Sequence, residues 1–137
     1  MPNEPSWLSV DDVIALNKLA VAATDEPFGI VHPGSLESAV MRPRNRWAYG
    51  EADIVALAAD FCAAIARNHP FLQGNKRTAF AAMDGFLAQN GWALKWEDED
   101  ETGEALVRLL TRDISEEAFF AIVAANVRIA RSDERSW

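Results

Sequence analysis

Apolar residues recur every three or four positions along most of the chain, and this spacing predicts a mainly helical protein. The clearest stripe is in residues 51–68, where Ile54, Leu57, Phe61 and Ile65 fall on one face of a predicted helix. Many alanines lie between them and allow close neighbours, so we expect this helix to be central in the fold. The same spacing predicts the rest of a set of about six helices, at residues 9–24, 35–41, 75–89, 105–110 and 115–130.

Two short segments do not follow the helical pattern. Residues 92–96 alternate in polarity, which predicts a short strand or an extended arm. Residues 28–31 are an apolar piece that suits a strand and a loop equally well. Neither segment is long enough to organise a sheet, so the predicted fold class is all-α.

Residues that begin and end helices support these boundaries. Ser9 followed by Asp12 resembles a capping box at the start of the first helix. Ser115 precedes two glutamates and is a typical N-cap for the last helix. The pair Asn90-Gly91 is a strong signal for the end of the helix at 75–89.

A proline shapes the expectation for the segment before the central helix. Pro43 is expected to end the helix at 35–41, because the residue before a proline avoids helical backbone angles. Residues 42–50 are then a loop, and this loop carries the arginines at 42, 44 and 46 beside Trp47 and Tyr49. Such a loop suits contacts with an anion or a partner, or an ordinary surface position with its aromatic residues anchored in the core.

Length and composition fit one globular domain. The chain has 137 residues, of which 50% are hydrophobic and 25% are charged, and a domain of this size buries a core without disulfides or metals. We expect a single domain over residues 1–137, loosely ordered at 1–8 and 132–137. No apolar run is long enough to span a membrane, and no signal-peptide pattern is present. The single cysteine, Cys62, cannot form an internal disulfide, so we expect a cytoplasmic protein without a membrane partner.

The charge pattern indicates local anion sites rather than a nucleic-acid surface. The formal net charge is -8, which disfavours general electrostatic binding to nucleic acid. Much of the acid lies in residues 97–101, which we interpret as a solvated loop and helix start. The cations are concentrated in residues 42–46 and in Lys76 and Arg77.

The start of the helix at 75–89 has the residues of a phosphate site. The first backbone N–H groups of a helix lack intrahelical partners and, with the helix dipole, attract anions. Gly74 permits a tight turn and a close approach of phosphate, while Asn75 can donate to a phosphate oxygen or cap the helix. Lys76 supplies a compact charge, and Arg77 can make a forked contact to phosphate. Cations in a first turn oppose the helix dipole, and a bound anion explains their presence.

A histidine precedes this site across the turn. Histidine as a residue type can act as a general base near neutral pH, so His69 can take a proton from an attacking hydroxyl, if its ring faces the same pocket. A histidine at a helix end is also commonly a C-terminal cap or a surface group. From the residues alone, an anion site is favoured, and a catalytic role and a structural role for His69 are both open.

The stretch His69-Pro70-Phe71-Leu72-Gln73-Gly74-Asn75-Lys76-Arg77-Thr78 resembles the signature of the Fic/Doc (Fido) superfamily, in particular its death-on-curing (Doc) branch. The similarity continues upstream through residues 35–43 and 49–68 and covers most of residues 28–96. This resemblance implies an α-helical Fic/Doc-like domain in which the signature loop lies between two central helices.

The resemblance also implies a reaction. Members of the superfamily transfer part of a nucleoside triphosphate to a protein hydroxyl, and Fic proteins proper transfer AMP. Their signature has a second glycine and a further arginine where this chain has Lys76 and Phe80, a departure that Doc toxins share. It therefore implies transfer of the γ-phosphate of ATP to a hydroxyl of a translation elongation factor, which stops protein synthesis.

Within that reaction the resemblance assigns roles to residues of this chain. His69 is the implied general base, and Gly74, Asn75, Lys76 and Arg77 are the implied phosphate-binding residues. The family usually has an acidic residue, associated with Mg²⁺, where this chain has Gln73. An amide oxygen is a weaker ligand than a carboxylate for a hard cation. Gln73 therefore keeps open a catalytically weak binding module as an alternative, beside an AMP transferase.

The implied biological setting is a type II toxin–antitoxin pair. Doc toxins are neutralised by a small antitoxin encoded beside them, so a Phd-like antitoxin is the expected partner. The chain has no Ser/Thr-x-x-x-Glu-Gly/Asn segment of the kind with which some Fic proteins inhibit themselves. We therefore expect control by a partner in trans.

Overall fold

The computed structural model describes residues 3–95 and 99–130. This part of the chain forms the helices α1 (Val10–Ala23), α2 (Pro33–Ala48), α3 (Ile54–Asn68), α4 (Asn75–Gln89), α5 (Glu99–Leu110) and α6 (Glu116–Ala125). Its two short strands, β1 (Trp92–Leu94) and β2 (Val127–Ile129), pair antiparallel. The prediction of an all-α fold with about six helices is confirmed.

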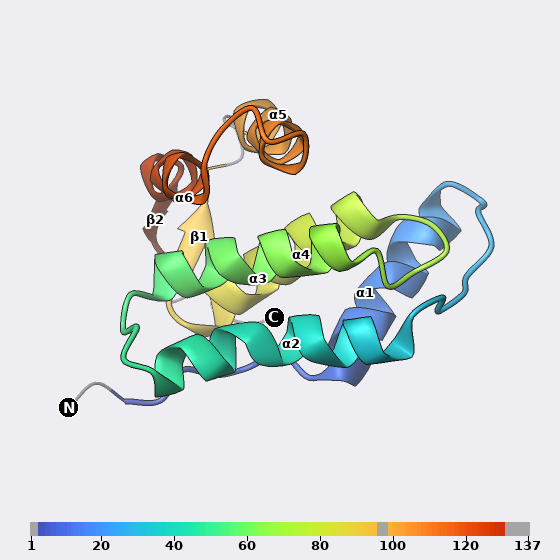
Figure 1. The fold of residues 1–137 in the computed structure, drawn as a ribbon, viewed down its shortest axis with the longest axis horizontal. Coiled ribbons are helices and arrows are strands. Elements are labelled where there is room, and N and C mark those ends of the chain that lie inside the picture. Colours follow the sequence, from blue (N-terminus) through green and yellow to red (C-terminus); the bar gives the residue numbers. More distant parts are fainter. Residues whose placement is uncertain (1–2, 96–98, 131–137) are drawn as a thin grey trace.

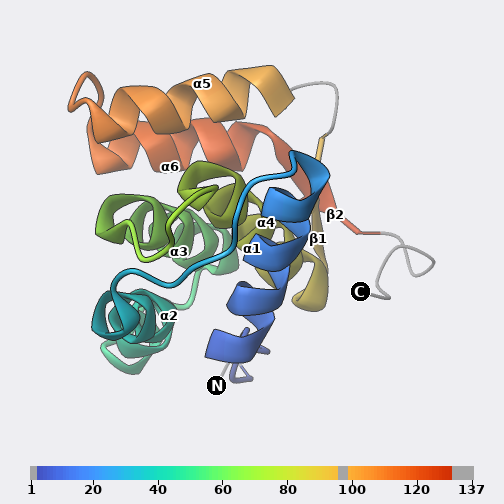
Figure 2. The same ribbon diagram turned by 90° about the vertical axis from the view of Figure 1, so that its right-hand side faces the viewer.

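Helix α3 lies at the centre, as its alanine-rich sequence predicts. It contacts α2 and α4 as well as α5 and α6, and Figure 1 shows it between α2 and the α5–α6 pair. Figure 2 shows α5 and α6 side by side on one side of this core. The helix starts at Ile54 rather than at residue 51, because the Asp53 side chain accepts hydrogen bonds from the N–H groups of Val55 and Ala56 and is thus its N-cap.

The prediction that Pro43 ends a short helix is wrong. Helix α2 continues through Pro43 to Ala48. Pro43 is buried, as are Leu36, Ala39 and Val40 of the same helix. A proline inside a helix costs about 3 kcal/mol. Burial of this apolar stripe against the core offsets that cost, so tertiary packing overrides the local rule.

The predicted arginine loop is also wrong, because most of residues 42–50 belong to α2. Arg42 Nε lies 3.0 Å from Asp60 Oδ2, and Arg46 lies 3.5 Å from Asp60 Oδ1. Asp60 is a buried carboxylate on α3, and Arg46 also pairs with Glu51. Two of the arginines therefore neutralise buried or nearby acids and join α2 to α3. Arg44 lies over the ring of Trp7.

The last helix is shorter than its apolar stripe suggested. Helix α6 is capped by Ser115, as predicted, but it ends at Ala125. The Asn126 side chain donates to Ile122 O, and the chain then enters β2, where Val127 pairs with Leu94 of β1. The strand predicted at 92–96 is thus confirmed as far as Leu94, and residue 96 lies outside the described residues.

The N-terminal segment is anchored to the far end of α4. Ser6 N donates to the Asn90 side chain, which donates in return to Ser6 O. Trp7 stacks on Phe86 with ring centroids 5.7 Å apart. The C-terminal residues 132–137, expected to be loosely ordered, lie outside the described residues. In the part of the chain described, no helix combines the length and apolarity needed to cross a membrane.

Candidate active site

The signature loop connects α3 to α4 and lines one open hollow of about 420 Å³. Two residues in left-handed backbone conformations shape the loop, His69 (φ 45°) after α3 and Gly74 (φ 75°) before α4. Leu72 lines this hollow together with all the candidate residues, which are His69, Gln73, Gly74, Asn75, Lys76 and Arg77. The structure thus brings together every site residue that the sequence indicated.

Gly74 is required at its position for two reasons. Its positive φ strains any residue with a side chain. A Cβ placed here would also lie 3.3 Å from Val21 Cγ1 and 3.4 Å from the side-chain nitrogens of Arg77 and Asn17. The close approach of α1 to the loop therefore depends on this glycine.

The Asn75 side chain closes the loop. Its Oδ1 accepts from Phe71 N and its Nδ2 donates to Phe71 O, each over 2.9 Å. The side chain is buried, so these bonds replace water for both backbone groups. The carboxamide is thus engaged with the loop, while the backbone N–H of Asn75, at the start of α4, faces no intrahelical acceptor. Its role in phosphate binding stays a prediction.

The same amide sets the protonation pattern of the His69 ring. Because Phe71 fixes which end of the Asn75 amide is the NH₂ group, that group is also the one 3.3 Å from His69 Nδ1. An NH₂ group can only donate, so Nδ1 acts as the acceptor. The neutral ring then carries its proton on Nε2, and its basic lone pair is on Nδ1. The contact is long for a hydrogen bond, so a substrate hydroxyl can displace it.

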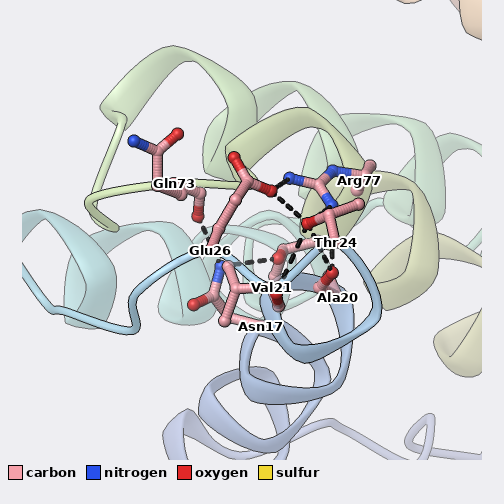
Figure 3. Close-up of polar contacts among 8 residues, drawn as sticks. Asn17, Ala20, Val21, Thr24, Glu26, Gln73 and Arg77 are labelled. Atoms are coloured by element: carbon pink, nitrogen blue, oxygen red, sulfur yellow. Dashed lines mark hydrogen bonds and ion pairs between the residues drawn. The ribbon is translucent and has the colours of Figure 1, made fainter.

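Two residues of the hollow have side chains directed to solvent. Lys76 is exposed and, within the described ranges, forms no ion pair. Gln73 is exposed as well, and Figure 3 shows its side chain directed away from Asn17 while its backbone carbonyl faces Asn17. The ammonium of Lys76 is therefore the available positive charge at the start of α4.

Arg77 is held by the end of α1. Its NH1 donates to Ala20 O over 2.9 Å and to the Thr24 hydroxyl over 3.0 Å, and its NH2 pairs with Glu26 (Figure 3). The Thr24 hydroxyl also donates to Glu26, and these hydrogen bonds, with that from Thr24 the larger, hold the pKa of the Glu26 carboxyl below its usual range. A phosphate at Arg77 would therefore meet a guanidinium already partly neutralised.

A residue of α1 that the sequence did not single out contacts the loop directly. Asn17 is fully buried, and its Nδ2 donates to Gln73 O over 2.8 Å and to Thr78 Oγ1 over 3.0 Å. Asn17 lies more than fifty positions from Gln73, and Thr24 and Glu26 lie more than fifty positions from Arg77. No local motif marks such residues, and only an argument from the packing of α1 on α4 could have found them.

The described residues do not form a magnesium centre. No group of three or more His, Cys, Asp or Glu side chains within these ranges is arranged to hold a metal ion. Gln73 offers one amide oxygen, and the nearby Glu26 carboxylate is engaged by Arg77 and Thr24. The residues present therefore do not fit a metal held by the protein itself.

The arrangement as a whole suits phosphate chemistry. Three groups line one open hollow: a helix N-terminus, the Lys76 ammonium, which forms no ion pair within the described ranges, and the His69 imidazole, whose Nδ1 is held by a long contact with Asn75. The first two attract a polyanion, and the third takes a proton. An incoming hydroxyl next to a bound phosphate would meet all three.

Comparison with known proteins gives consistent matches. The sequence model of the Fic/DOC family matches residues 7–87, which include α1, the signature loop and most of α4. Protein kinase doc of Escherichia phage P1 is 32% identical over 109 residues, which cover 79% of this chain and 85% of that protein. Toxin Doc of Mycolicibacterium smegmatis is 35% identical over 130 residues, which cover 92% of this chain and 97% of that protein.

Proposed function

The chain belongs to the Fic/DOC family, in its Doc branch, and we propose that it is a Doc-type toxin that stops protein synthesis. In this proposal it transfers the γ-phosphate of ATP to a hydroxyl of a translation elongation factor. The observation that carries the proposal is Lys76, a cation without an ion-pair partner among the described residues, at the start of α4 in the same hollow as His69. The names of the two relatives, a protein kinase and a toxin, support both halves of it.

The phosphates of ATP are bound by the start of α4. The free N–H groups of its first turn and the Lys76 ammonium attract the triphosphate. Gly74 lets the phosphate approach the backbone closely. Arg77 contributes mainly by holding the first turn of α4 to α1, because its guanidinium is engaged by Ala20, Thr24 and Glu26.

His69 activates the substrate hydroxyl. Its Nδ1 lone pair accepts the hydroxyl proton as the oxygen attacks the γ-phosphorus, and the contact with Asn75 is given up in this step. A bond forms between the hydroxyl oxygen and phosphorus, and the bond from phosphorus to the bridging β–γ oxygen breaks. ADP leaves with the electron pair of that bond, and the proton stays on His69 until it is lost to solvent.

ATP is the proposed co-substrate, and Mg²⁺ is proposed to arrive on its phosphates. The chain lacks a carboxylate cluster in its described part, so no step is assigned to a metal held by the protein. We place the reaction in the cytoplasm, where ATP and elongation factors are present. A Phd-like antitoxin is the proposed partner, because toxins of this type are neutralised in trans.

Controlled expression in a bacterial host tests the toxin function. Wild-type protein should stop incorporation of labelled methionine, and His69→Ala should restore it to the level of an empty vector. His32→Ala is a matched control, because His32 is exposed and its side chain makes no cap hydrogen bond. Full incorporation with the wild type, or full toxicity of His69→Ala, would contradict the proposal. Co-expression of a Phd-like antitoxin, which the proposal expects to be encoded beside the gene, should suppress the toxicity of the wild type.

Gln73 gives a specific reason to test a second function, a binding module with weak or no transfer activity. Binding of ATP in Mg²⁺ should be measured for the wild type and for Gln73→Asp, which restores a carboxylate. Detectable binding and toxicity in the wild type support the toxin. Binding and toxicity that appear only in Gln73→Asp support the module.

A further inference from the structure

We propose that Asn17 is a positioning residue that sets the geometry of the phosphate site from a different helix. Its side chain holds the peptide between Gln73 and Gly74 in one orientation. The identity of the ligand at that site rests on the proposed function, whereas the effect of Asn17 on the loop does not.

The contacts of Asn17 reach both sides of the turn into α4. Its Nδ2 donates to Gln73 O, just before the helix, and to Thr78 Oγ1, in the first turn of the helix. Asn17 and Thr78 are both fully buried, so water does not compete for the bond between them, and the bond to Gln73 O is partly buried. One amide group on α1 therefore fixes the loop and the helix start relative to each other, and Figure 3 shows its contact with Gln73.

The orientation of one peptide follows from this contact. In the described part of the chain no peptide bond is cis, and in a trans peptide the C=O and N–H groups point in opposite directions. Because Asn17 binds the Gln73 carbonyl, the Gly74 N–H is directed away from α1. Gln73 and Gly74 both line the hollow, so the Gly74 N–H is the group that the proposal assigns to an anion there.

Packing alone does not account for an asparagine at this position. Asn17 Oδ1 is buried and has no hydrogen-bond partner in the described part of the chain. A buried polar atom without a partner is unfavourable, and leucine has a similar shape without that atom. The asparagine is explained by its donor group, which holds the loop, and not by its contribution to the core.

Asn17→Leu removes the donor and keeps a side chain of similar volume. Asn17→Ala is a second variant, to be used if the Asn17→Leu protein does not fold. Asn90→Ala is the matched control. It removes three side-chain hydrogen bonds, to Ser6 N, Ser6 O and Phe86 O, at the opposite end of α4. Asn17→Gln keeps an NH₂ group and tests for partial rescue.

Amide hydrogen exchange provides the first readout, and it does not depend on activity. Residues 72–76 should exchange at least about tenfold faster in Asn17→Leu than in the wild type, because the loop loses its anchor. Residues 83–87, in the buried part of α4, should keep the exchange rates of the wild type. The control Asn90→Ala should leave residues 72–76 as in the wild type. Wild-type exchange of the loop in both Asn17 variants would overturn the inference.

Steady-state kinetics with ATP and an elongation factor give the second readout. For Asn17→Leu we expect KM for ATP to rise about tenfold with kcat changed less than about threefold, because binding is lost more than chemistry. Asn17→Gln should recover part of this loss, and Asn90→Ala should show none. A wild type that neither binds ATP nor transfers phosphate would contradict the proposed function, while the exchange experiment would still decide the role of Asn17.

Discussion

The side chain of Asn75 hydrogen-bonds to both backbone groups of Phe71, and each of the two distances is 2.9 Å. The signature loop is therefore closed by a side chain from its own sequence, which satisfies both the N–H and the C=O group of Phe71. The same amide faces His69. Asn75, a proposed phosphate-binding residue, is thus also the internal support of the loop that carries the proposed base.

We expect Asn75→Ala to lower the free energy of unfolding by about 2–4 kcal/mol, because it leaves the buried N–H and C=O groups of Phe71 without partners. Urea denaturation measures this loss. Asn68→Ala is the matched control, since among the described residues the Asn68 side chain makes one hydrogen bond, to Ala64 O. It should cost about 1 kcal/mol. Equal losses in the two variants would show that Asn75 does not support the loop.

The tautomer of His69 is a second prediction. Nδ1 faces the Asn75 NH₂ group, so the neutral ring should have its proton on Nε2. Nitrogen chemical shifts of the selectively labelled imidazole distinguish the two forms. In Asn75→Asp, where a carboxylate replaces the NH₂ donor, the preference should reverse toward the Nδ1–H form. A wild-type ring with its proton on Nδ1 would contradict the assigned contact.

The Arg77–Glu26 pair predicts a specific pH dependence. The pKa of Glu26 is lowered from 4.5 by hydrogen bonds from Thr24 and then Arg77. A carboxyl whose pKa is lower in the folded protein than in the unfolded chain stabilises the fold at pH values above its unfolded pKa. This stabilisation is lost as the pH falls through the folded pKa. An NMR titration of the Glu26 carboxyl carbon should therefore have its midpoint below 4.5.

Arg77→Met should raise that midpoint only part of the way, because the Thr24 bond persists. The control Arg67→Met should leave Glu26 unchanged and instead raise the midpoint of Glu116, whose pKa is lowered by its hydrogen bond from Arg67. A Glu26 midpoint that is the same in the wild type and in Arg77→Met would mean that the pair does not form in solution.

Cys62 provides a probe of the central helix. It is fully buried in α3, and burial raises its pKa to about 12. Near pH 8 a disulfide reagent should react with the native protein at least about a hundredfold more slowly than with the protein in denaturant, because the thiolate is the reactive form. Rapid reaction of the native protein would show that α3 is not the buried centre of the fold.

The sequence was sufficient where the determining residues are close together along the chain. The signature is contiguous, so the sequence alone indicates its six candidate residues, and the fold brings them into one hollow. The capping box of Ser9 and the N-cap Ser115 are also local, and both are present.

The predictions were wrong or incomplete where contacts between residues far apart in the sequence determine the local structure. Pro43 was expected to break its helix, but the burial of its stripe against the core overrides the backbone preference. Asn17 and Glu26 contact the signature loop and α4 from α1 and the segment after it, and no pattern in their neighbourhood indicates this. Their positions follow from how α1 packs on α4, which is a property of the tertiary structure.

Transfer of label from ATP to an elongation factor tests the central claim most directly. The purified chain should be incubated with a bacterial translation extract and ATP labelled at either the γ- or the α-phosphate, with His69→Ala in parallel. The account predicts that a protein of the extract acquires label from the γ position only, and only with intact His69. Label acquired from the α position would contradict phosphate transfer and would show that the chain transfers AMP.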